Sequence, residues 1–191
     1  MRKHKLVIAG ATLLAASLAM SACGTRTETP SGGASGSSDK VAKIGVIAPL
    51  SGDLSALGLG IKNSVDLAIK QANENKTIPG WTLELDAQDD EAKPDVGKNA
   101  ATKLAGDDEV VGVVGALNSS VSQSLQPVFA SANVVQVSPA NTGPGLTQGP
   151  DQSNKKRPYP TFFRTCTTDI IQGAFSSFLG LPFPVTTSTS R

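Results

Sequence analysis

The chain has 191 residues, with 17 basic and 16 acidic side chains and a formal net charge of +1. A chain this close to neutrality, with no interleaving of basic and aromatic residues, is not expected to bind nucleic acid. One histidine and two cysteines leave too few soft ligands for a structural zinc site, so we expect neither a metal nor another cofactor. The length favours one domain, or one and a fraction.

The first 22 residues predict a secretory signal peptide, with three basic residues near the start and an apolar run over residues 6–19. That run is too short to cross a bilayer comfortably as a permanent helix. Small residues lead directly into Cys23, a pattern that resembles the lipobox of bacterial lipoproteins, although Met20 departs from the usual leucine. The resemblance implies that Cys23 is acylated and becomes the first residue after cleavage. The alternative is a secreted protein with an incidental cysteine.

Residues 23–40 are rich in Ser, Gly and Thr and predict a flexible tether between the lipid and the folded part. Removal of residues 1–22 removes three basic residues and no acidic ones, which leaves 14 basic and 16 acidic side chains and a net charge of −2. With Cys23 in a lipid, Cys166 has no partner, so no intramolecular disulfide is expected.

Residues 44–50 form an apolar, β-branched run closed by a proline, which is typical of a buried first strand. Residues 51–60 contain three glycines and two serines and predict a loop. A helix is expected from residue 61 until residues 75–80 break it. Its inward-facing positions are Ile61, Val65, Ala68 and Ala72.

Leu83 and Leu85 alternate with polar residues and predict a second strand, which runs into Asp89, Asp90 and Glu91. These carboxylates lack the regular oxygen spacing and the glycine turn of a calcium loop. We therefore expect a solvated loop at the strand end rather than an acid/base or cation site. A second helix follows, with Val96, Ala100 and Leu104 facing inward.

A glycine-rich and valine-rich strand at residues 110–115 passes into a helix near Ser119, and this junction is the strongest candidate for a binding site. The amides of a first helical turn have no intrahelical acceptor, and the helix dipole adds partial positive charge. Ser119 and Ser120 add hydroxyl donors beside those amides. The junction therefore predicts a carboxylate or phosphate site at the carboxyl edge of a sheet. The alternative is that Ser119 serves only as an N-cap.

A fourth strand is expected at residues 134–137, followed by a long polar loop, a short strand at 159–164 and the start of a helix at 168–175. Strands that alternate with helices in this way predict an α/β fold, a three-layer αβα sandwich with a parallel sheet. The inward positions of the third helix are Val121, Leu125, Val128 and Ala132.

Five motifs resemble, in order and spacing, the substrate-binding lipoproteins of branched-chain amino acid ABC importers. They are IGVIAPLSG at residues 44–52, the Asp89-Asp90 pair, GALNSS at 115–120, SPANT at 138–142 and FRTCTTDIIQG at 163–173. The resemblance implies the type I periplasmic-binding fold, with a Rossmann-like ligand-binding lobe at residues 41–165. It also implies an amino acid ligand and an ABC permease as partners.

In that family the serine matching Ser119 and the amides beside it hold the α-carboxylate of the ligand. Residues matching Ala140, through its carbonyl, and Thr142, through its hydroxyl, receive the α-ammonium. Ser119 and Thr142 are 23 residues apart, which agrees with the family spacing. Ser120 and Asn118 lie in the same motif and join the candidate ligand-binding residues. For Thr142 the alternative is a hydroxyl that only stabilises a turn.

Two departures from the family concern single positions. Leu57 stands where several relatives carry an aromatic residue that packs on the ligand, so Leu57 is a candidate contact and the side-chain preference of the site stays open. Asn118 and Ala92 occupy positions that form a disulfide in the best-known relatives, so that link is not expected here.

Members of that family are considerably longer and have a second α/β lobe. Here the pattern stops near Phe175, and residues 176–191 show no helical or strand period. We therefore expect a truncated form with the first lobe and, at residues 166–175, the start of the crossover to the second. Its expected place is the extracytoplasmic face of a bacterial membrane, on the periplasmic side in a Gram-negative cell.

Two other functions remain open. One is a non-functional anchored fragment, and the other is a Rossmann-like enzyme that uses a nucleotide. The enzyme needs a G-x-G-x-x-G fingerprint, which residues 112–115 do not supply. The only histidine, His4, lies in the expected signal peptide, and Cys166 therefore has no histidine to activate it. We expect a binding protein and not an enzyme.

Overall fold

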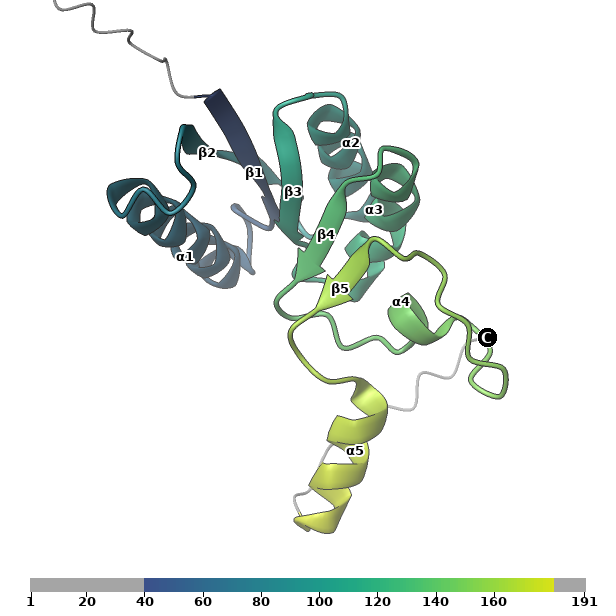
Figure 1. Ribbon diagram of the computed structural model, residues 1–191. Coiled ribbons are helices and arrows are strands. Elements are labelled where there is room, and N and C mark those ends of the chain that lie inside the picture. Colours follow the sequence, from purple (N-terminus) through teal and green to yellow (C-terminus); the bar gives the residue numbers. More distant parts are fainter. Residues whose placement is uncertain (1–39, 181–191) are drawn as a thin grey trace, which may run out of the picture. The chain divides into compact units, whose positions relative to one another are not determined.

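The computed structural model describes residues 40–180 (Figure 1). The expected signal peptide, Cys23, almost all of the tether and the last part of the tail lie outside the described residues. Strands and helices alternate along most of the described chain. No helix within residues 40–180 is long and apolar enough to cross a membrane.

The strands form one parallel sheet in the order β2-β1-β3-β4-β5, which confirms the predicted α/β class. The strands are β1 (Lys40–Ala48), β2 (Trp81–Asp89), β3 (Val110–Gly115), β4 (Val135–Ser138) and β5 (Phe162–Arg164). The helices are α1 (Ser55–Glu74), α2 (Pro94–Ala105), α3 (Ser119–Ser131), α4 (Gly145–Gln148) and α5 (Asp169–Phe178).

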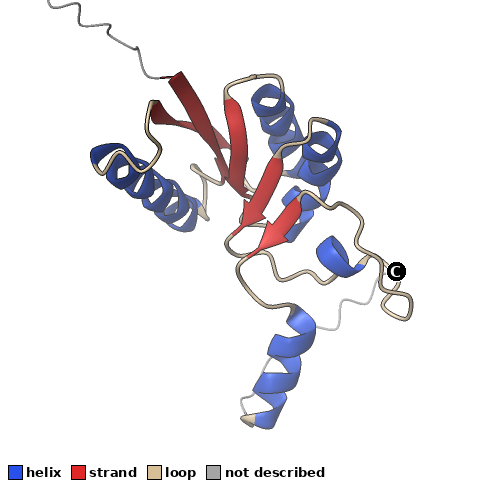
Figure 2. Ribbon diagram, in the orientation of Figure 1, coloured by secondary structure: helices blue, strands red, loops and turns tan. Residues whose placement is uncertain are grey.

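Helices cover both faces of the sheet, as the alternating pattern predicts. α1 lies on one face, and α2 and α3 lie together on the other (Figures 1 and 2). Two adjacent residues of β1 point to opposite faces of the sheet, as successive residues of a strand do, and their neighbours identify the helices on each face. Ile44 lines a groove with α1, whereas a Cβ at Gly45 would lie 2.8 Å from a methyl group of Leu104 in α2.

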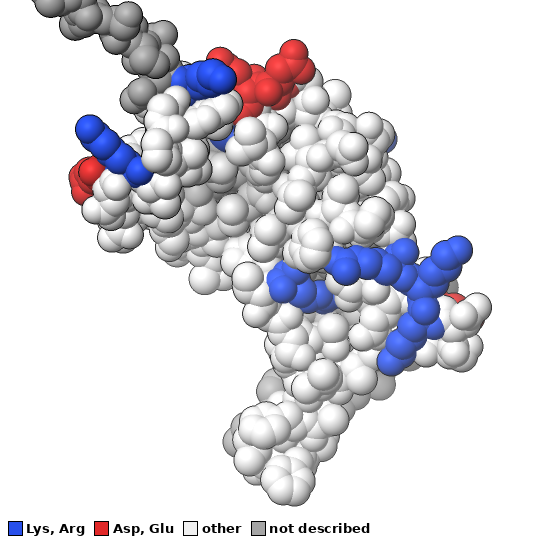
Figure 3. Space-filling model, viewed as in Figure 1, with Lys and Arg blue, Asp and Glu red and all other residues white. Residues whose placement is uncertain are grey.

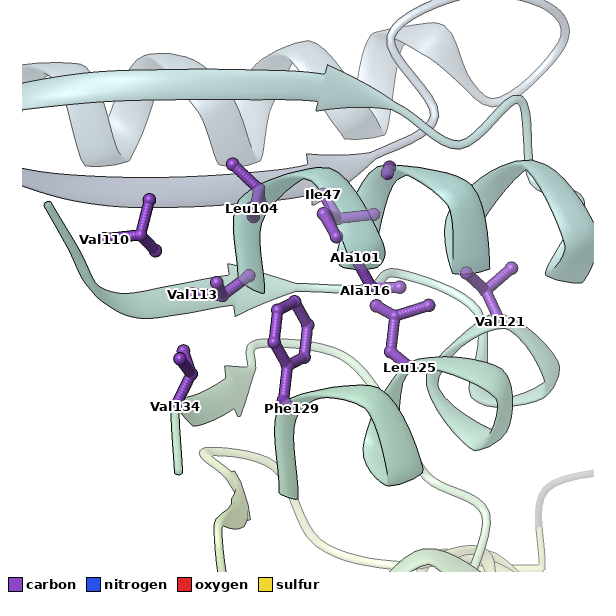
Figure 4. Packing of buried hydrophobic residues seen from close by; sticks show 11 residues of the cluster. Ile47, Ala101, Leu104, Val110, Val113, Ala116, Val121, Leu125, Phe129 and Val134 are labelled. Atoms are coloured by element: carbon purple, nitrogen blue, oxygen red, sulfur yellow. The ribbon is translucent and has the colours of Figure 1, made fainter. Parts of the chain in front are cut away.

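The main core lies between the sheet and the α2–α3 pair (Figure 4). Leu104 of α2 and Leu125 and Phe129 of α3 are fully buried there. They pack against Ile47 of β1 and Val113 of β3. Burial of a side chain of this size stabilises a fold by about 1.5–3 kcal/mol, so this cluster fixes the position of α3 relative to the sheet.

α1 begins at Ser55, not near residue 61, so the predicted loop over residues 51–60 is wrong in its second half. Glycines usually mark loops, but Gly58 is needed here for close packing. A Cβ at Gly58 would lie 1.9 Å from the carbonyl oxygen of Pro49, at the end of the β1 segment. The first turn of α1 therefore touches the backbone that leaves β1, and only glycine allows this approach.

Three details of the other helices also differ from the prediction. Ala132 is exposed because α3 ends at Ser131, and Phe129 takes the inward position instead. Ala68 is exposed although it lines the groove beneath α1, and the buried residues of α1 are Gly58 and Ile69. α5 continues to Phe178, beyond the point where the family pattern was expected to stop.

Within residues 40–180, one part of the sheet has no helix over it. Val114, Val137 and Phe163 are neighbours across β3, β4 and β5, so their side chains point to the same face of the sheet. This is the face on which α1 lies, but α1 covers it only at β1 and β2. On this face Val135 is 42% exposed and Phe163 is 45% exposed. We call this region of β3, β4 and β5 the uncovered sheet face. Much of the surface in Figure 3 is likewise free of charged side chains.

Candidate ligand-binding site

The predicted site residues lie in loops and in the first turns of helices that follow the carboxyl ends of the strands. The strand order changes direction between β1 and β3, so α1 and α3 leave these neighbouring strands toward opposite faces. Ligands of open α/β sheets bind outside the strand ends at such a point. β3 ends at Gly115 and α3 begins at Ser119, while β4 ends at Ser138 and leads into the loop with Ala140 and Thr142.

Buried polar side chains from β4 hold the segment between β3 and α3. Gln136 donates through Nε2 to the carbonyl oxygen of Gly115 at 3.0 Å and to Oγ of Ser122 at 3.1 Å. Ser138 donates through Oγ to the carbonyl oxygen of Ala116 at 2.8 Å. All three side chains are fully buried, where each hydrogen bond is strengthened by the low local dielectric. The start of α3 is therefore held from β4.

Ser119 is the first residue of α3 and is not its N-cap. Asn118 occupies the N-cap position with extended backbone angles, but its side chain makes no capping hydrogen bond. The Ser119 Oγ accepts a hydrogen bond from the amide of Gly143 at 3.1 Å. A hydroxyl group that accepts one bond keeps its own hydrogen for donation. Ser119 is thus a half-buried donor, tied to the loop after β4.

The first turn of α3 supplies further donors. The amides of Ser119, Ser120 and Val121 have no acceptor within the helix, and among the described residues they donate to no acceptor elsewhere. Ser120 is exposed beside them, and Asn118 is partly buried with its Oδ1 unpartnered in the described structure. Hydroxyl and amide donors at the positive end of a helix dipole match a carboxylate.

The loop after β4 brings Ala140 and Thr142 close to this helix start. Gly143, next to Thr142, donates to Ser119, and Asn141 donates through Nδ2 to the carbonyl oxygen of Leu117 at 2.8 Å. The Ala140 amide is held by Ser138 Oγ at 3.3 Å. Both candidate residues are partly exposed and lie in the loop that is bonded to the start of α3.

Leu57 lies in the first turn of α1, which follows β1 at this edge, and its side chain is 58% exposed. No contact between Leu57 and the α3 junction is recorded in the described structure, so it flanks the site from the other face of the sheet. Among the candidate residues, Leu57 is therefore the one that lies apart from the α3 junction.

The acidic loop after β2 is not a solvated loop, which corrects the prediction for Asp90. Asp90 is fully buried beneath α2 and α3, and only Glu91 is exposed. Burial raises the pKa of Asp90 above its ordinary value. For Asp89, burial alone raises the pKa, but bonds from the Ser51 hydroxyl and from backbone amides together lower it. No cluster of metal-binding side chains occurs within residues 40–180.

An apolar groove of about 440 Å³ lies beneath α1, away from this edge. Its lining is almost entirely aliphatic, so it offers no set of donors for a carboxylate or acceptors for an ammonium group. The junction before α3, with its hydroxyl and amide donors, fits a charged amphipathic ligand better. The groove residues include Ile44, Val65, Ile69, Leu83 and Val114.

Sequence reasoning missed the residues that support the site. Gln136 and Asn141 are buried and donate to backbone carbonyls of distant segments, and buried Ser122 accepts from the Ala116 amide and from Gln136 Nε2. A usable signal was the polar side chain at an inward position, since Ser122 follows Val121 and Gln136 lies between two valines. Cys166 is free, with its Sγ 3.0 Å from the carbonyl oxygen of Asn141.

Comparison with known proteins gives consistent results. A family model described as periplasmic binding protein matches residues 41–174. A Leu/Ile/Val-binding protein of Rhizobium johnstonii is 36% identical over 126 residues, which cover 66% of this chain and 32% of the relative. The chain thus spans about a third of the length of the curated relatives it matches.

Solved structures show the same fold. The branched-chain amino acid transporter substrate-binding protein of Streptococcus pneumoniae, in complex with isoleucine, is 27% identical with a TM-score of 0.61, over 74% of this chain and 39% of that one. A solute-binding protein of Rhodopseudomonas palustris in complex with 3,4-dihydroxybenzoic acid is 26% identical with a TM-score of 0.59, over 73% and 37% of the two chains.

Proposed function

The chain belongs to the periplasmic binding protein family, and on that premise we propose that it is the substrate-binding component of an ABC importer. The proposed ligands are branched-chain amino acids or related small amphipathic carboxylates. The observation that carries this proposal is the start of α3, where the Ser119 hydroxyl accepts from Gly143 and keeps its hydrogen free to donate, beside amides without acceptors.

The proposed ligand pose follows from charge. The α-carboxylate binds the Ser119 hydroxyl and the amides of the first turn of α3, with Ser120 at the exposed side. The α-ammonium binds the Ala140 carbonyl oxygen and the Thr142 hydroxyl, because neutral oxygen atoms are the acceptors that this loop offers. Asn118 and Leu57 complete the proposed contacts, Leu57 toward the ligand side chain.

We place the protein at the extracytoplasmic face of a bacterial membrane. Residues 1–22 are proposed as a signal peptide, Cys23 as the acylated residue and residues 23–40 as the tether. Residues 41–165 are the proposed ligand-binding lobe, and residues 166–175 begin the crossing to a second lobe. Metabolic labelling with a palmitate analogue tests the anchor: the protein should be marked, and Cys23→Ala should abolish the label.

A matched pair of serine variants tests the site. Ser119→Ala removes a hydrogen bond to a charged ligand group, which is worth roughly 1.5–3 kcal/mol, so leucine affinity should fall by about tenfold or more. Ser124→Ala changes the same atoms inside the same helix and should leave affinity within about twofold. Calorimetry with leucine measures both. Equal effects of the two substitutions would remove Ser119 from the site.

A further inference from the structure

Arg164, the last residue of β5, holds the loop that carries the proposed ammonium acceptors. Its Nη1 donates to the carbonyl oxygens of Asn141 at 3.0 Å and of Gly143 at 2.9 Å. Its Nη2 donates to the hydroxyl oxygen of Thr147 at 2.5 Å. One guanidinium group therefore joins two points of the loop after β4 and one point in α4.

Within residues 40–180, Arg164 forms no salt bridge with a carboxylate. Every ion pair found within residues 40–180 involves a lysine, at Lys43, Lys70 or Lys93. Basic side chains gather near β5 (Figure 3), but Arg164 is the one whose donors are used on the loop after β4. Hydrogen bonds from a charged donor to neutral oxygens are stronger than bonds between neutral groups.

Gly143 connects this arginine to the anion site. Its carbonyl oxygen accepts from Arg164, and its amide donates to the Ser119 Oγ. A Cβ at Gly143 would lie 3.2 Å from both Cβ and Oγ of Ser119, so the loop already touches the helix start. The loop position that Arg164 fixes is therefore the position that orients the Ser119 hydroxyl.

We propose that Arg164 is a positioning residue for the ligand site and acts on Ser119 through Gly143. Lysine cannot replace it, because a single ammonium group cannot present a planar fork to two carbonyls and a hydroxyl at once. The expected effect of Arg164 on ligand affinity rests on the function proposed above. Its effect on the loop after β4 in the ligand-free protein is independent of that function.

Arg157 provides a matched control. It is an exposed arginine whose donors bond the carbonyl oxygens of Tyr159 and Phe162 and whose guanidinium group lies 4.7 Å from the Phe163 ring centroid. None of these partners belongs to the loop after β4. Arg157→Lys therefore removes a guanidinium from the same region without loosening Gly143.

The first measurement is amide hydrogen exchange of the ligand-free 191-residue chain, followed by NMR. Arg164→Lys should speed amide exchange at Gly143 by tenfold or more. The exchange rate of the Val113 amide in β3 should stay unchanged, which shows that the fold is intact. Arg157→Lys should leave Gly143 unchanged. If Arg164→Lys unfolds the chain, Thr147→Val, which removes only one of the three bonds, should still speed exchange at Gly143. Unchanged exchange at Gly143 in the folded variants would overturn the proposal.

The second measurement is a double-mutant cycle on leucine binding. Arg164→Lys and Ser119→Ala should each lower leucine affinity. The affinity of the double variant should lie within about twofold of that of Ser119→Ala, because both substitutions act through one hydroxyl. Effects that multiply would mean that Arg164 does not act through Ser119. If the wild-type chain fails to bind leucine, the proposed ligand is wrong, while the exchange at Gly143 still decides the role of Arg164.

Discussion

At the scale of single residues, Asp90 shows how burial changes the chemistry of a carboxyl group. Its Oδ1 accepts the amide of Ala92 at 2.8 Å, and its Oδ2 has no partner among the described residues. Burial disfavours the charged form and so raises the pKa of Asp90 above the ordinary value of 3.8. The folded protein therefore holds this proton to a higher pH than the unfolded chain does.

Asp90→Asn should make stability less dependent on pH. Because the pKa of Asp90 is higher in the folded protein, its protonation stabilises the fold. This contribution is fully present below pH 3.8, the pKa in the unfolded chain, and is lost as pH rises through the folded pKa. Asparagine does not titrate, so the unfolding free energy of the variant should gain on the wild type as pH rises above the unfolded pKa of 3.8. Urea unfolding as a function of pH measures the difference.

The exposed variant Asp53→Asn controls for the loss of one negative charge. A difference between Asp90→Asn and the wild type that stays constant with pH would show that burial does not shift the pKa of Asp90.

Sequence reasoning reached Ser119 because strand-to-helix junctions have a local signature of glycines, serines and helical spacing. It did not reach Gln136, Asn141 or Arg164, because their partners lie 14 to 25 residues away in sequence. It also placed Asp90 in water, since two adjacent aspartates look the same in a buried turn and a solvated loop. Whether a polar residue is buried and satisfied depends on the tertiary fold.

At the scale of elements, the contact between α1 and the end of the β1 segment decides where the first helix begins. Gly58 and Gly60 stand two residues apart in the same helix but in different surroundings. A Cβ at Gly58 meets the backbone of Pro49, while a Cβ at Gly60 would have nothing within 4 Å. Gly58 is therefore required by close packing, whereas Gly60 can be replaced by a larger residue.

Gly58→Ala should destabilise the fold by about 1–3 kcal/mol, because the added methyl group forces α1 away from Pro49. Gly60→Ala adds the same atoms in open space and should stabilise the fold by about 0.5–1 kcal/mol, because alanine has the higher helix propensity. Denaturant unfolding compares the two variants. A similar change from both substitutions would contradict the close approach at Gly58.

The order and type of the elements could be predicted because hydrophobic periodicity is local. Val121 and Leu125, for example, share one face of α3 and are both fully buried. The helix ends were less predictable: glycines suggested a loop where α1 begins, and α3 stops just before Ala132. Packing against other elements decides both ends, and a single-sequence pattern does not contain that information.

At the scale of the whole described molecule, the uncovered sheet face is the least typical feature for a soluble domain. Val111 is 57% exposed on the same side as Val135 and Phe163. Parallel sheets are normally covered on both faces, and large exposed apolar patches favour association. The face is a liability for this chain in isolation.

We expect the 191-residue chain to self-associate through this face. The double substitution Val111→Thr and Val135→Thr keeps β-branched side chains but adds hydroxyl groups, and should shift sedimentation velocity profiles toward monomer. High salt should not reverse association of the wild type, because the contact is apolar. Unchanged association in the double variant would place the contact elsewhere.

The proposed site is open in the described structure, with Ser120 exposed and Leu57 58% exposed. The ceiling for a ligand as small as leucine is roughly −13 kcal/mol when nearly every atom is engaged. A site that leaves the aliphatic side chain in water loses about half of this, so the chain by itself should bind at roughly −6 kcal/mol, or tens of micromolar and weaker.

The most direct test of the ligand site is an NMR titration of the isotope-labelled chain with leucine up to millimolar concentration, which detects weak binding. We expect amide shift changes centred on Ser119, Ser120 and Thr142, with none at Gly80 near the opposite edge of the sheet. Shift changes centred on the groove beneath α1, or none at all, would contradict a carboxylate site at the start of α3.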